Sequence, residues 1–530
     1  MYDFVIKNGI VIDGTGSPKR RADIAFRDGI IAAIGNLEHT QAVVTIDATG
    51  KVIAPGFIDV NNHSDVYWQI FKAPHLESLV TQGITTIIGG NAGSSLAPLI
   101  SKQDIRSIQK WTDVDHINFN WLSVAEFLDE LEKKRIGINF ATLVGHGTMR
   151  RGVMHDQSRS ITPEEIRMIG QLLTEALKEG AFGMSTGLKY THALSAAPRE
   201  IVEFAKILKK NNALYTTYIR NEAEGVTTAV EEAILVGMDA KLPVHISHLK
   251  AVYPENWGKF DEVLERIDTA ALRGVEISFD IYPYTSTSSV LYTLLPEWVT
   301  RKGRIVMLAQ LRDPRVRAQV IQDMLKEAHN YNDLVIAVSR VNSVAGHKKI
   351  ADIAALQGVT PEEAVVNVLL ASEGRAIVSH EVLSPLNIEK GLQSPHSIIS
   401  SNGVGYRQDH GTTGDFVHPR NFGTFPRVLG EYVRKKKILA LEEAIYKMTG
   451  KPAKVFRLEK RGILRVGYAA DIVIFDPETI DDPATLENPY QYSTGIDYVF
   501  VNGLPTVKKG VVQKECAGKV LRKKKKKRFF

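Results

Sequence analysis

The chain has 530 residues, of which 44% are hydrophobic and 24% charged, which is enough for a large core and more than one domain. The formal net charge of +6 arises at the extreme C-terminus, where Arg522, Lys523 to Lys527 and Arg528 stand together, so the rest of the chain is nearly neutral. A nearly neutral body excludes a basic nucleic-acid-binding surface. No apolar run reaches the ~20 residues of a membrane span, and the single cysteine, Cys516, excludes disulfides within the chain.

The two ends of the chain indicate where the protein resides and what it contacts. The first residues, Met1 to Ile6, lack the basic and then apolar layout of a secretory signal, so we expect a cytoplasmic protein. The basic tail, residues 521–530, is of low complexity, and its like charges repel one another and stay solvated. We interpret it as a disordered, solubilising end. The alternative is a contact with anionic surfaces such as anionic lipid, with Phe529 and Phe530 as a weak anchor.

Short strands separated by turns occupy residues 1–55. Glycines that follow aspartates, as in Asp13-Gly14 and Asp28-Gly29, mark turns because glycine tolerates a positive φ. The same pattern of short strands and turns occurs again at 462–520. We therefore predict a small β-sandwich domain built from both termini, residues 1–55 and 455–520. The strand-like stretches at the N-terminal end are 2–7, 11–13, 22–27 and 30–34.

The middle of the chain alternates short apolar strands with helical stretches, which indicates a parallel sheet with crossover helices. Eight such units close an α/β barrel of the TIM type, (β/α)8, which we predict for residues 56–454. Helix 163–178 has Thr162 as its expected N-cap. Residues 291–396 contain helix-like stretches, and we interpret them as a lid or insert over the barrel mouth. The predicted barrel strands are 56–60, 85–89, 139–144, 181–185, 213–218, 243–247, 276–280 and 397–401.

The segment after the first predicted barrel strand carries the first recognisable motif. In barrel enzymes the chemistry lies at the C-terminal ends of the strands. Here Asp59-Val60-Asn61-Asn62-His63 resembles an apolar strand that runs into Asp-x-His-x-His, with Asn61 in place of the first histidine. Alternation along a strand places Asn61 and His63 on the same side, toward the barrel axis.

Further segments along nearly the whole chain are similar, in the same order, to the D-aminoacylase (N-acyl-D-amino-acid deacylase) family of the amidohydrolase superfamily. The resemblance implies a barrel enzyme that hydrolyses the amide C–N bond of an N-acyl amino acid or a related substrate with a carboxylate. The matching segments are Gly83-Ile84-Thr85-Thr86, Gly145-His146-Gly147-Thr148, Ser185-Thr186-Gly187-Leu188-Lys189-Tyr190, Arg220-Asn221-Glu222, Ile246-Ser247-His248-Leu249-Lys250, Asn256-Trp257-Gly258-Lys259, Asp280-Ile281-Tyr282-Pro283-Tyr284-Thr285, His418-Pro419-Arg420, Met448-Thr449-Gly450 and Ala470-Asp471-Ile472-Val473.

The zinc site that the resemblance implies is largely missing from this sequence. The family takes its ligands from a histidine pair after strand one, a cysteine after strand two, histidines after strands five and six, and an aspartate after strand eight. Only His63 and His248 are retained as metal ligands. The other four positions carry Asn61, Ala92, Tyr218 and Asn402.

These replacements remove electron-pair donors that zinc prefers. Zinc is held by about four thiolate, imidazole or carboxylate ligands. Alanine has no donor, and an amide or a neutral phenol is a poor one. Asn402 cannot serve as the general base that an aspartate would provide. We therefore expect either no cofactor or weak zinc, unless Asp65 or Glu222 supplies a further ligand.

The resemblance assigns roles to the residues that remain. His248 or His63 is the expected base, Tyr218 or Tyr190 the expected proton donor, and Asn402 stands at the position of the lost carboxylate. The substrate is expected to be a small molecule with a carboxylate. The residues expected to bind it are Lys250, Arg420, Tyr190, Tyr282 and Arg220.

Two other readings stay open from the sequence alone. One is a non-hydrolytic paralogue, that is, a pseudoenzyme with a binding or regulatory role. The other is a metal-independent lyase, isomerase or cyclase that uses the same pocket. The sequence also leaves open whether the protein is an oligomer.

Overall fold

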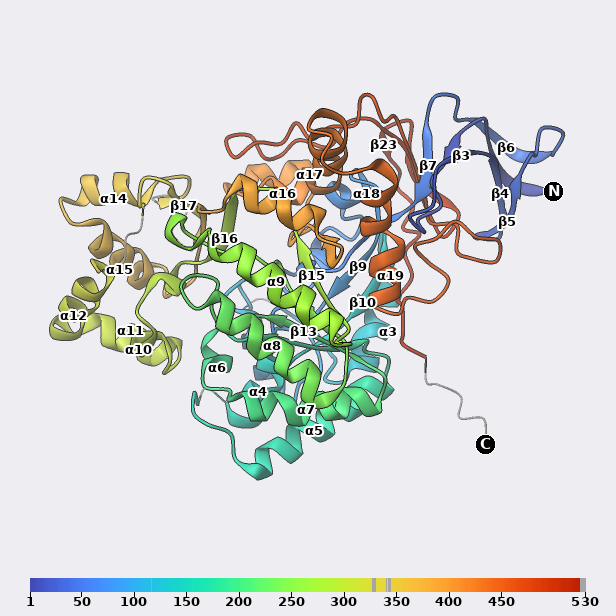
Figure 1. The fold of residues 1–530 in the computed structure, drawn as a ribbon. Helices are drawn as coiled ribbons and strands as arrows, with labels where there is room; N and C mark the ends of the chain where they lie inside the picture. The colour runs from blue at the N-terminus through green and yellow to red at the C-terminus, as the bar shows by residue number, and fades with distance from the viewer. Residues whose placement is uncertain (116, 156, 327–329, 340, 342–344, 525–530) are drawn as a thin grey trace.

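The computed structural model describes residues 1–115, 117–155, 157–326, 330–339, 341 and 345–524, and its centre is the predicted (β/α)8 barrel (Figure 1). Neighbouring strands pair in parallel in chain order, and β11 continues the line of β10. A parallel bridge between Asn62 and Gly403 closes the ring. All eight predicted strands are confirmed. They are β8 (Phe57–Asp59), β9 (Ile84–Gly89), β10 (Asn139–Thr142) with β11 (Val144–Gly145), β12 (Gly183–Gly187), β13 (Leu214–Tyr218), β14 (Val244–Ile246), β15 (Ile277–Ile281) and β19 (Ser397–Ile399).

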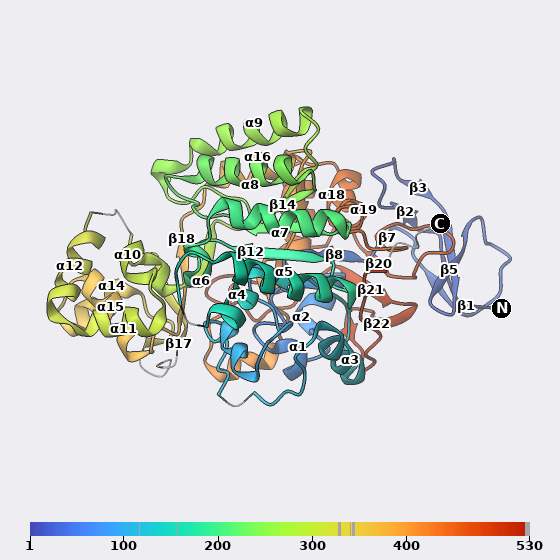
Figure 2. The same cartoon turned by 90° about the horizontal axis from the view of Figure 1, so that it is seen from below.

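Helices surround the barrel because each has one apolar stripe to bury (Figure 2). In α5, for example, Ile169, Leu173 and Leu177 lie on the buried side. The helices that cover the barrel include α3 (Val124–Lys134), α5 (Pro163–Lys178), α7 (Pro198–Lys210), α8 (Val226–Ala240), α9 (Lys259–Leu272), α16 (Pro385–Gln393) and α18 (Leu441–Met448). Further helices include α1 (Gln69–Lys72), α2 (Glu77–Val80), η1 (Lys102–Ile108), α4 (His146–Met154), α6 (Thr191–Leu194), α17 (Arg420–Arg427) and α19 (Gly450–Val455).

Helix α5 begins at the predicted cap. The Thr162 hydroxyl accepts a hydrogen bond from the Glu165 backbone N–H at 3.3 Å, and the Glu165 carboxylate accepts the Thr162 N–H at 2.8 Å. We expect Thr162→Ala to lower the free energy of unfolding by about 1 kcal/mol, because an N-terminal N–H of the helix loses its acceptor. Denaturant unfolding measures the change. Thr162→Ser keeps the hydroxyl and is the control; equal losses in the two variants would contradict a capping role.

The insert over the barrel mouth is an antiparallel sheet covered by helices. It lies to one side of the barrel in both views (Figures 1 and 2). The sheet has the order β16-β18-β17. The insert's apolar core also contains Ala92, Tyr190 and Tyr218 of the barrel, which seat it on the C-terminal ends of the barrel strands. Its elements are β16 (Ser286–Val290), α10 (Glu297–Thr300), α11 (Arg304–Arg312), α12 (Pro314–Met324), β17 (Leu334–Ser339), α14 (Ile350–Gln357), α15 (Pro361–Ala371) and β18 (Ala376–Glu381).

The insert starts and ends earlier in the chain than the sequence indicated. Helix α16, within the predicted insert 291–396, packs on β15 and β19 and is therefore a barrel helix. Its length of nine residues lies within the range of the insert helices, so its place is established by the strands that it contacts. We propose an insert that runs from β16 to β18, within a barrel region of 56–454.

Both termini build the β-sandwich. One sheet has the order β5-β4-β1-β6 and the other β23-β22-β21-β20-β7-β2-β3, so N- and C-terminal strands share the second sheet. Ile24, Phe26, Ile53, Ile472 and Phe500 belong to the apolar core of this unit. We propose the boundaries 1–55 and 455–520 on the support of this shared sheet. The strands are β1 (Tyr2–Lys7), β2 (Ile10–Val11), β3 (Arg20–Arg21), β4 (Asp23–Arg27), β5 (Ile30–Gly35), β6 (Ala42–Asp47), β7 (Val52–Pro55), β20 (Ile472–Phe475), β21 (Ile496–Val501), β22 (Leu504–Lys508) and β23 (Val511–Val512).

The start of the basic tail is bound to the barrel rather than solvated. The Leu521 N–H donates to the carbonyl of Phe140 at 2.7 Å, and the Lys523 N–H donates to Gly180 at 2.9 Å. The Arg522 guanidinium lies 2.6 Å from the Asp129 carboxylate. The prediction of a disordered end from 521 onward is therefore wrong for 521–524, because main-chain pairing and an ion pair hold this stretch. Residues 525–530 lie outside the described part of the chain. Within the described part, no helix is long and apolar enough to cross a membrane.

Candidate active site

His63 and Asn402 face each other at the barrel mouth. The His63 Nε2 lies 2.7 Å from the Asn402 Oδ1, and the His63 backbone N–H donates to the Gly403 carbonyl at 2.8 Å. Both side chains are buried. Burial, and then the nearby Arg420 guanidinium, lower the pKa of His63 to about 4 despite the hydrogen bond to Asn402. The imidazole is therefore neutral near pH 7, and with Nε2–H donating to the amide oxygen it keeps a lone pair on Nδ1.

A buried carboxylate lies beside these two residues. Asp280, in β15, accepts a hydrogen bond from His245 Nε2 at 2.9 Å and another from the Ser400 hydroxyl. It also accepts the Asn61 amide N–H at 3.2 Å, which leaves the Asn61 Oδ1 buried without a partner. Burial acts to raise the pKa of Asp280, but the hydrogen bonds from His245 and Ser400 and the nearby histidines together outweigh it, and the pKa is lowered. Asn61 is thus held in place by a charged carboxylate that the sequence analysis left without a role.

Four side chains from neighbouring barrel strands form a second cluster, Tyr218, Glu222, His248 and Lys250. The Lys250 ammonium donates to Glu222 Oε1 at 2.5 Å, to His248 Nδ1 at 2.8 Å and to the His248 carbonyl at 3.0 Å. The Tyr218 hydroxyl donates to Glu222 Oε2 at 3.2 Å, and its ring packs edge-on against the His248 imidazole. All four side chains are buried.

This cluster fixes the protonation of its members. Burial would raise the pKa of Glu222, but the Lys250 charge holds it well below its usual range, so Glu222 is ionised. Burial, and then the Glu222 charge, raise the pKa of Tyr218 well above 10 and keep it protonated. His248 Nδ1 lies 2.8 Å from the Lys250 ammonium and 3.3 Å from Glu222 Oε1, and because lysine can only donate, the shorter contact favours the imidazole proton on Nε2. His248 therefore presents a hydrogen-bond donor, and Lys250 has no N–H left over for a substrate.

Arg420 is a buried cation whose hydrogen-bond donors are not all paired. It begins α17 and is buried, yet its Nε and Nη1 have no hydrogen-bond partner among the described residues. Its guanidinium carbon lies 5.2 Å from the centroid of the Tyr282 ring, and the buried Tyr282 hydroxyl also has no partner. A buried donor without an acceptor costs about 1–3 kcal/mol of stability. Proteins retain such donors where a ligand accepts their hydrogen bonds. The N–H groups of an arginine and the hydroxyl of a tyrosine together suit a carboxylate ligand.

Tyr190 and Arg220 lie in different surroundings. Tyr190 packs edge-on against Tyr218, at 5.4 Å between ring centroids, and against Trp111 at 5.6 Å. The Arg220 guanidinium is occupied by Glu232, at 2.9 Å, and by the carbonyls of Leu194 and Ala196. The structure therefore brings Tyr190 toward the centre and ties Arg220 to the barrel wall.

The residues at the six ligand positions do not fit a zinc pair. Ala92 presents only a methyl group, and the Asn61 and Tyr218 side chains are held by carboxylates. A second cation at His248 would be repelled by the Lys250 ammonium, 2.8 Å from Nδ1. Across the described ranges of the chain, no group of three or more histidine, cysteine, aspartate or glutamate side chains is placed to hold a metal ion.

A small cavity of about 30 Å³ adjoins the site, and its lining includes His63, Asn402, Arg420 and Tyr67. This volume is enough for a water molecule with polar partners. It is too small for an N-acyl amino acid, so the site is closed in this conformation.

An eight-stranded barrel with a terminal β-sandwich and these side chains at its C-terminal edge defines an amidohydrolase-type enzyme. The sequence profile described as "Amidohydrolase family" matches residues 44–507. The chain belongs to this family, and relatives that are 33% and 35% identical over nearly its full length place it, within the family, among the D-aminoacylases.

Individual relatives agree with that placement over nearly their full length. D-aminoacylase of Alcaligenes xylosoxydans xylosoxydans is 33% identical over 98% of this chain and 97% of its own. N-acyl-D-glutamate deacylase from the same organism is 35% identical over 94% and 93%. The solved N-acyl-D-glutamate deacylase of Bordetella bronchiseptica, in complex with zinc and a phosphonate inhibitor, superposes with a TM-score of 0.84, at 34% identity over 98% of this chain and 99% of that one.

Proposed function

We propose that this protein hydrolyses the amide C–N bond of an N-acyl amino acid. The observation that carries the proposal is Arg420, a buried guanidinium with two N–H groups unpaired, next to the unpaired hydroxyl of Tyr282. A carboxylate would complete both. The relatives support the same substrate class, since those named above are D-aminoacylases and N-acyl-D-glutamate deacylases. The comparisons lend no support to the non-hydrolytic alternatives.

The geometry supports a division of labour between the two histidines. His248 Nε2–H donates to the oxygen of the acyl carbonyl and so makes its carbon more electrophilic. A water in the small cavity beside His63 adds its oxygen to that carbon. The neutral His63 takes the water proton on Nδ1 and returns it to the nitrogen as the C–N bond breaks, which releases a carboxylic acid and an amine. Lys250, Glu222 and Asn402 are positioning residues that hold the two imidazoles.

Substrate assays test the proposal directly. N-acetyl derivatives of D- and L-amino acids are compared with the same compounds in which the carboxylate is replaced by a primary amide. We expect kcat/KM to fall about 100-fold or more for the amides, because they cannot make charge-assisted hydrogen bonds with Arg420. Equal rates for both sets would contradict the role of Arg420, and an absence of turnover for every acyl compound would contradict hydrolysis.

We further propose that catalysis does not depend on tightly bound zinc, on the support of the poor ligand set. After dialysis we expect roughly 0.2 zinc ions per chain or fewer by elemental analysis, and a change in activity of about twofold or less with a chelator. The matched control restores four donors through Asn61→His, Ala92→Cys, Tyr218→His and Asn402→Asp, and should retain more zinc. One zinc ion retained per parent chain would overturn this proposal.

A further inference from the structure

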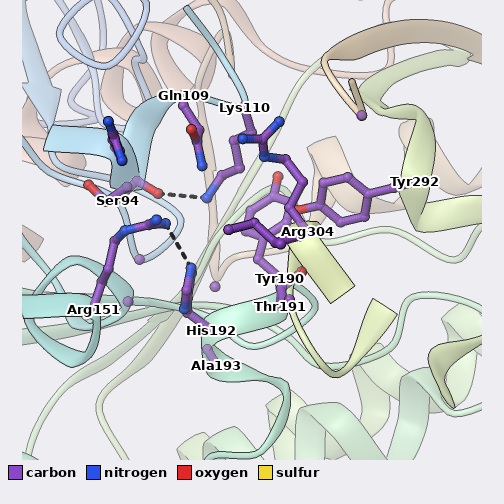
Figure 3. A pocket seen from close by; sticks show the side chains of 18 of the residues that line it. Ser94, Gln109, Lys110, Arg151, Tyr190, Thr191, His192, Ala193, Tyr292 and Arg304 are labelled. Carbon is purple, nitrogen blue, oxygen red and sulfur yellow. Dashed lines mark hydrogen bonds between the residues drawn. The ribbon is translucent and has the colours of Figure 1, made fainter. Parts of the chain in front are cut away.

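A partly enclosed cavity adjoins the site and lies between the barrel and the insert (Figure 3). Its volume is about 440 Å³. Ala92, Gly187 and Tyr190 form its inner end, next to the candidate active site. Its outer wall belongs to the insert and includes Arg304, at the start of α11, and Arg375. The cavity thus runs from the barrel centre outward beneath the insert.

Cationic side chains dominate the lining of this cavity. Among the described residues that line it, Asp115 is the only one with a carboxylate, and it lies 3.6 Å from the Arg375 guanidinium. The cationic residues of the lining are Arg106, Lys110, Arg151, Lys302, Arg304 and Arg375. Six basic residues against one acidic residue produce a positive potential in a partly enclosed space, which favours an anionic ligand.

Lys110 is the cation of this lining that lies closest to the Tyr190 ring. Its ammonium donates to the Ser94 hydroxyl at 3.0 Å and lies 4.4 Å above the Tyr190 ring, and no carboxylate of the described chain pairs with it. Burial, and then the Arg151 charge, lower the pKa of Lys110 to about 7. Figure 3 shows the Lys110 side chain reaching from the barrel side toward Tyr190, with Arg304 of the insert close by.

The cavity lies on the side of the barrel away from Arg420. Its inner residues follow β9, β11 and β12, whereas Tyr282 follows β15 and Arg420 lies beyond β19. In an N-acyl amino acid, the side chain and the carboxylate share one carbon, so both stay near Arg420. With the carboxylate at Arg420, the acyl group on the other side of the amide bond would extend across the barrel toward Lys110.

We propose that the cavity around Lys110 binds a negatively charged acyl group, so that the substrates are N-acyl amino acids whose acyl part is a dicarboxylic acid. The distal carboxylate pairs with Lys110 and the arginines from the barrel and the insert. The inference rests on the proposed function for its orientation, because it takes the amino-acid carboxylate to lie at Arg420.

The test compares two acyl groups of equal length. N-succinyl-D-alanine carries the distal carboxylate, and N-butanoyl-D-alanine ends in a methyl group. We expect kcat/KM to be about tenfold or more higher for the succinyl compound, as charge-assisted contacts allow. Lys110→Met should remove most of that ratio. Lys102→Met is the matched control: Lys102 is exposed on η1, outside the lining of this cavity, and its replacement should preserve the ratio.

Calorimetry with full-length protein separates this inference from the proposed function. If no acyl compound is hydrolysed, the proposed function is contradicted. The dissociation constants of the same two compounds still test whether the cavity binds the distal carboxylate. Tighter binding of the succinyl compound that weakens about tenfold in Lys110→Met supports it. Equal affinities, or a preference untouched by Lys110→Met, overturn it. Binding of inorganic phosphate that does not compete with N-succinyl-D-alanine would also overturn it.

Discussion

Replacing Arg420 by methionine is expected to lower kcat/KM for N-acyl amino acids by about 100-fold or more. The guanidinium is buried, its Nε and Nη1 have no partner in the described part of the chain, and methionine fills similar space without donors. Steady-state kinetics on an N-acetyl-D-amino acid measures the loss. Arg420→Lys keeps the charge without the fork and should lose less. The exposed Arg407→Met is the control and should behave as the parent.

The same substitution should stabilise the fold. A buried donor without an acceptor costs about 1–3 kcal/mol, so Arg420→Met is expected to raise the free energy of unfolding by a similar amount. Thermal unfolding without ligand measures the change. A substrate analogue should then stabilise the parent more than the variant, because the parent alone pairs with the carboxylate. A clear loss of stability would mean that Arg420 supports the fold rather than a ligand.

Glu222→Gln is expected to be the most destabilising single change in the site, at about 3–5 kcal/mol. Glu222 is buried and lies 2.5 Å from the Lys250 ammonium, which would be left without a compensating charge. The tautomer of His248 depends on the same lysine, so activity should fall as well. Denaturant unfolding and steady-state kinetics measure the two effects.

A double variant tests whether Glu222 and Lys250 stabilise the fold as a pair. In Glu222→Gln with Lys250→Met, no unpaired charge remains, so the loss of stability should be smaller than the sum of the two single losses. Glu262→Gln removes a carboxylate from the exposed pair with Arg266 and should leave the free energy of unfolding nearly unchanged, because water screens such a pair. Additive losses at Glu222 and Lys250 would show that the two side chains do not act together.

The barrel could be predicted because its strands are short apolar runs of nearly constant length, each followed by a polar motif. The positions of His63, His248 and Asn402 followed from their neighbours in the chain. Their hydrogen-bond partners could not be predicted, because these contacts join residues that follow different strands. The hydrogen bond between Lys250 and Glu222 is an example. Lys250 and Arg220 were grouped with Arg420 as substrate-binding residues, yet each is occupied by a glutamate. Only side-chain geometry distinguishes a paired cation from an unpaired one.

Asp280 and Lys110 show two further limits. Asp280 ends a predicted strand inside a segment that resembles the family, so its place at the barrel mouth could have been predicted. Its hydrogen bonds from His245 and Asn61 could not, because they depend on how the strands pack. Lys110 lies in no motif at all, and its importance appears only once the insert closes a cavity around it. The replacement of the metal ligands was readable residue by residue, since donor atoms are a property of side-chain chemistry.

The apolar contact between the insert and the barrel has a consequence for the rate of turnover. Ala92, Tyr190 and Tyr218 belong to the same apolar core as β16, β17 and β18, so admitting a substrate to the small cavity beside His63 and Arg420 requires those contacts to part. Wetting that apolar surface is unfavourable, which makes the open form a minor population. The opening rate of the insert would then limit kcat. Added viscogens should therefore lower kcat more than changes to the scissile bond do.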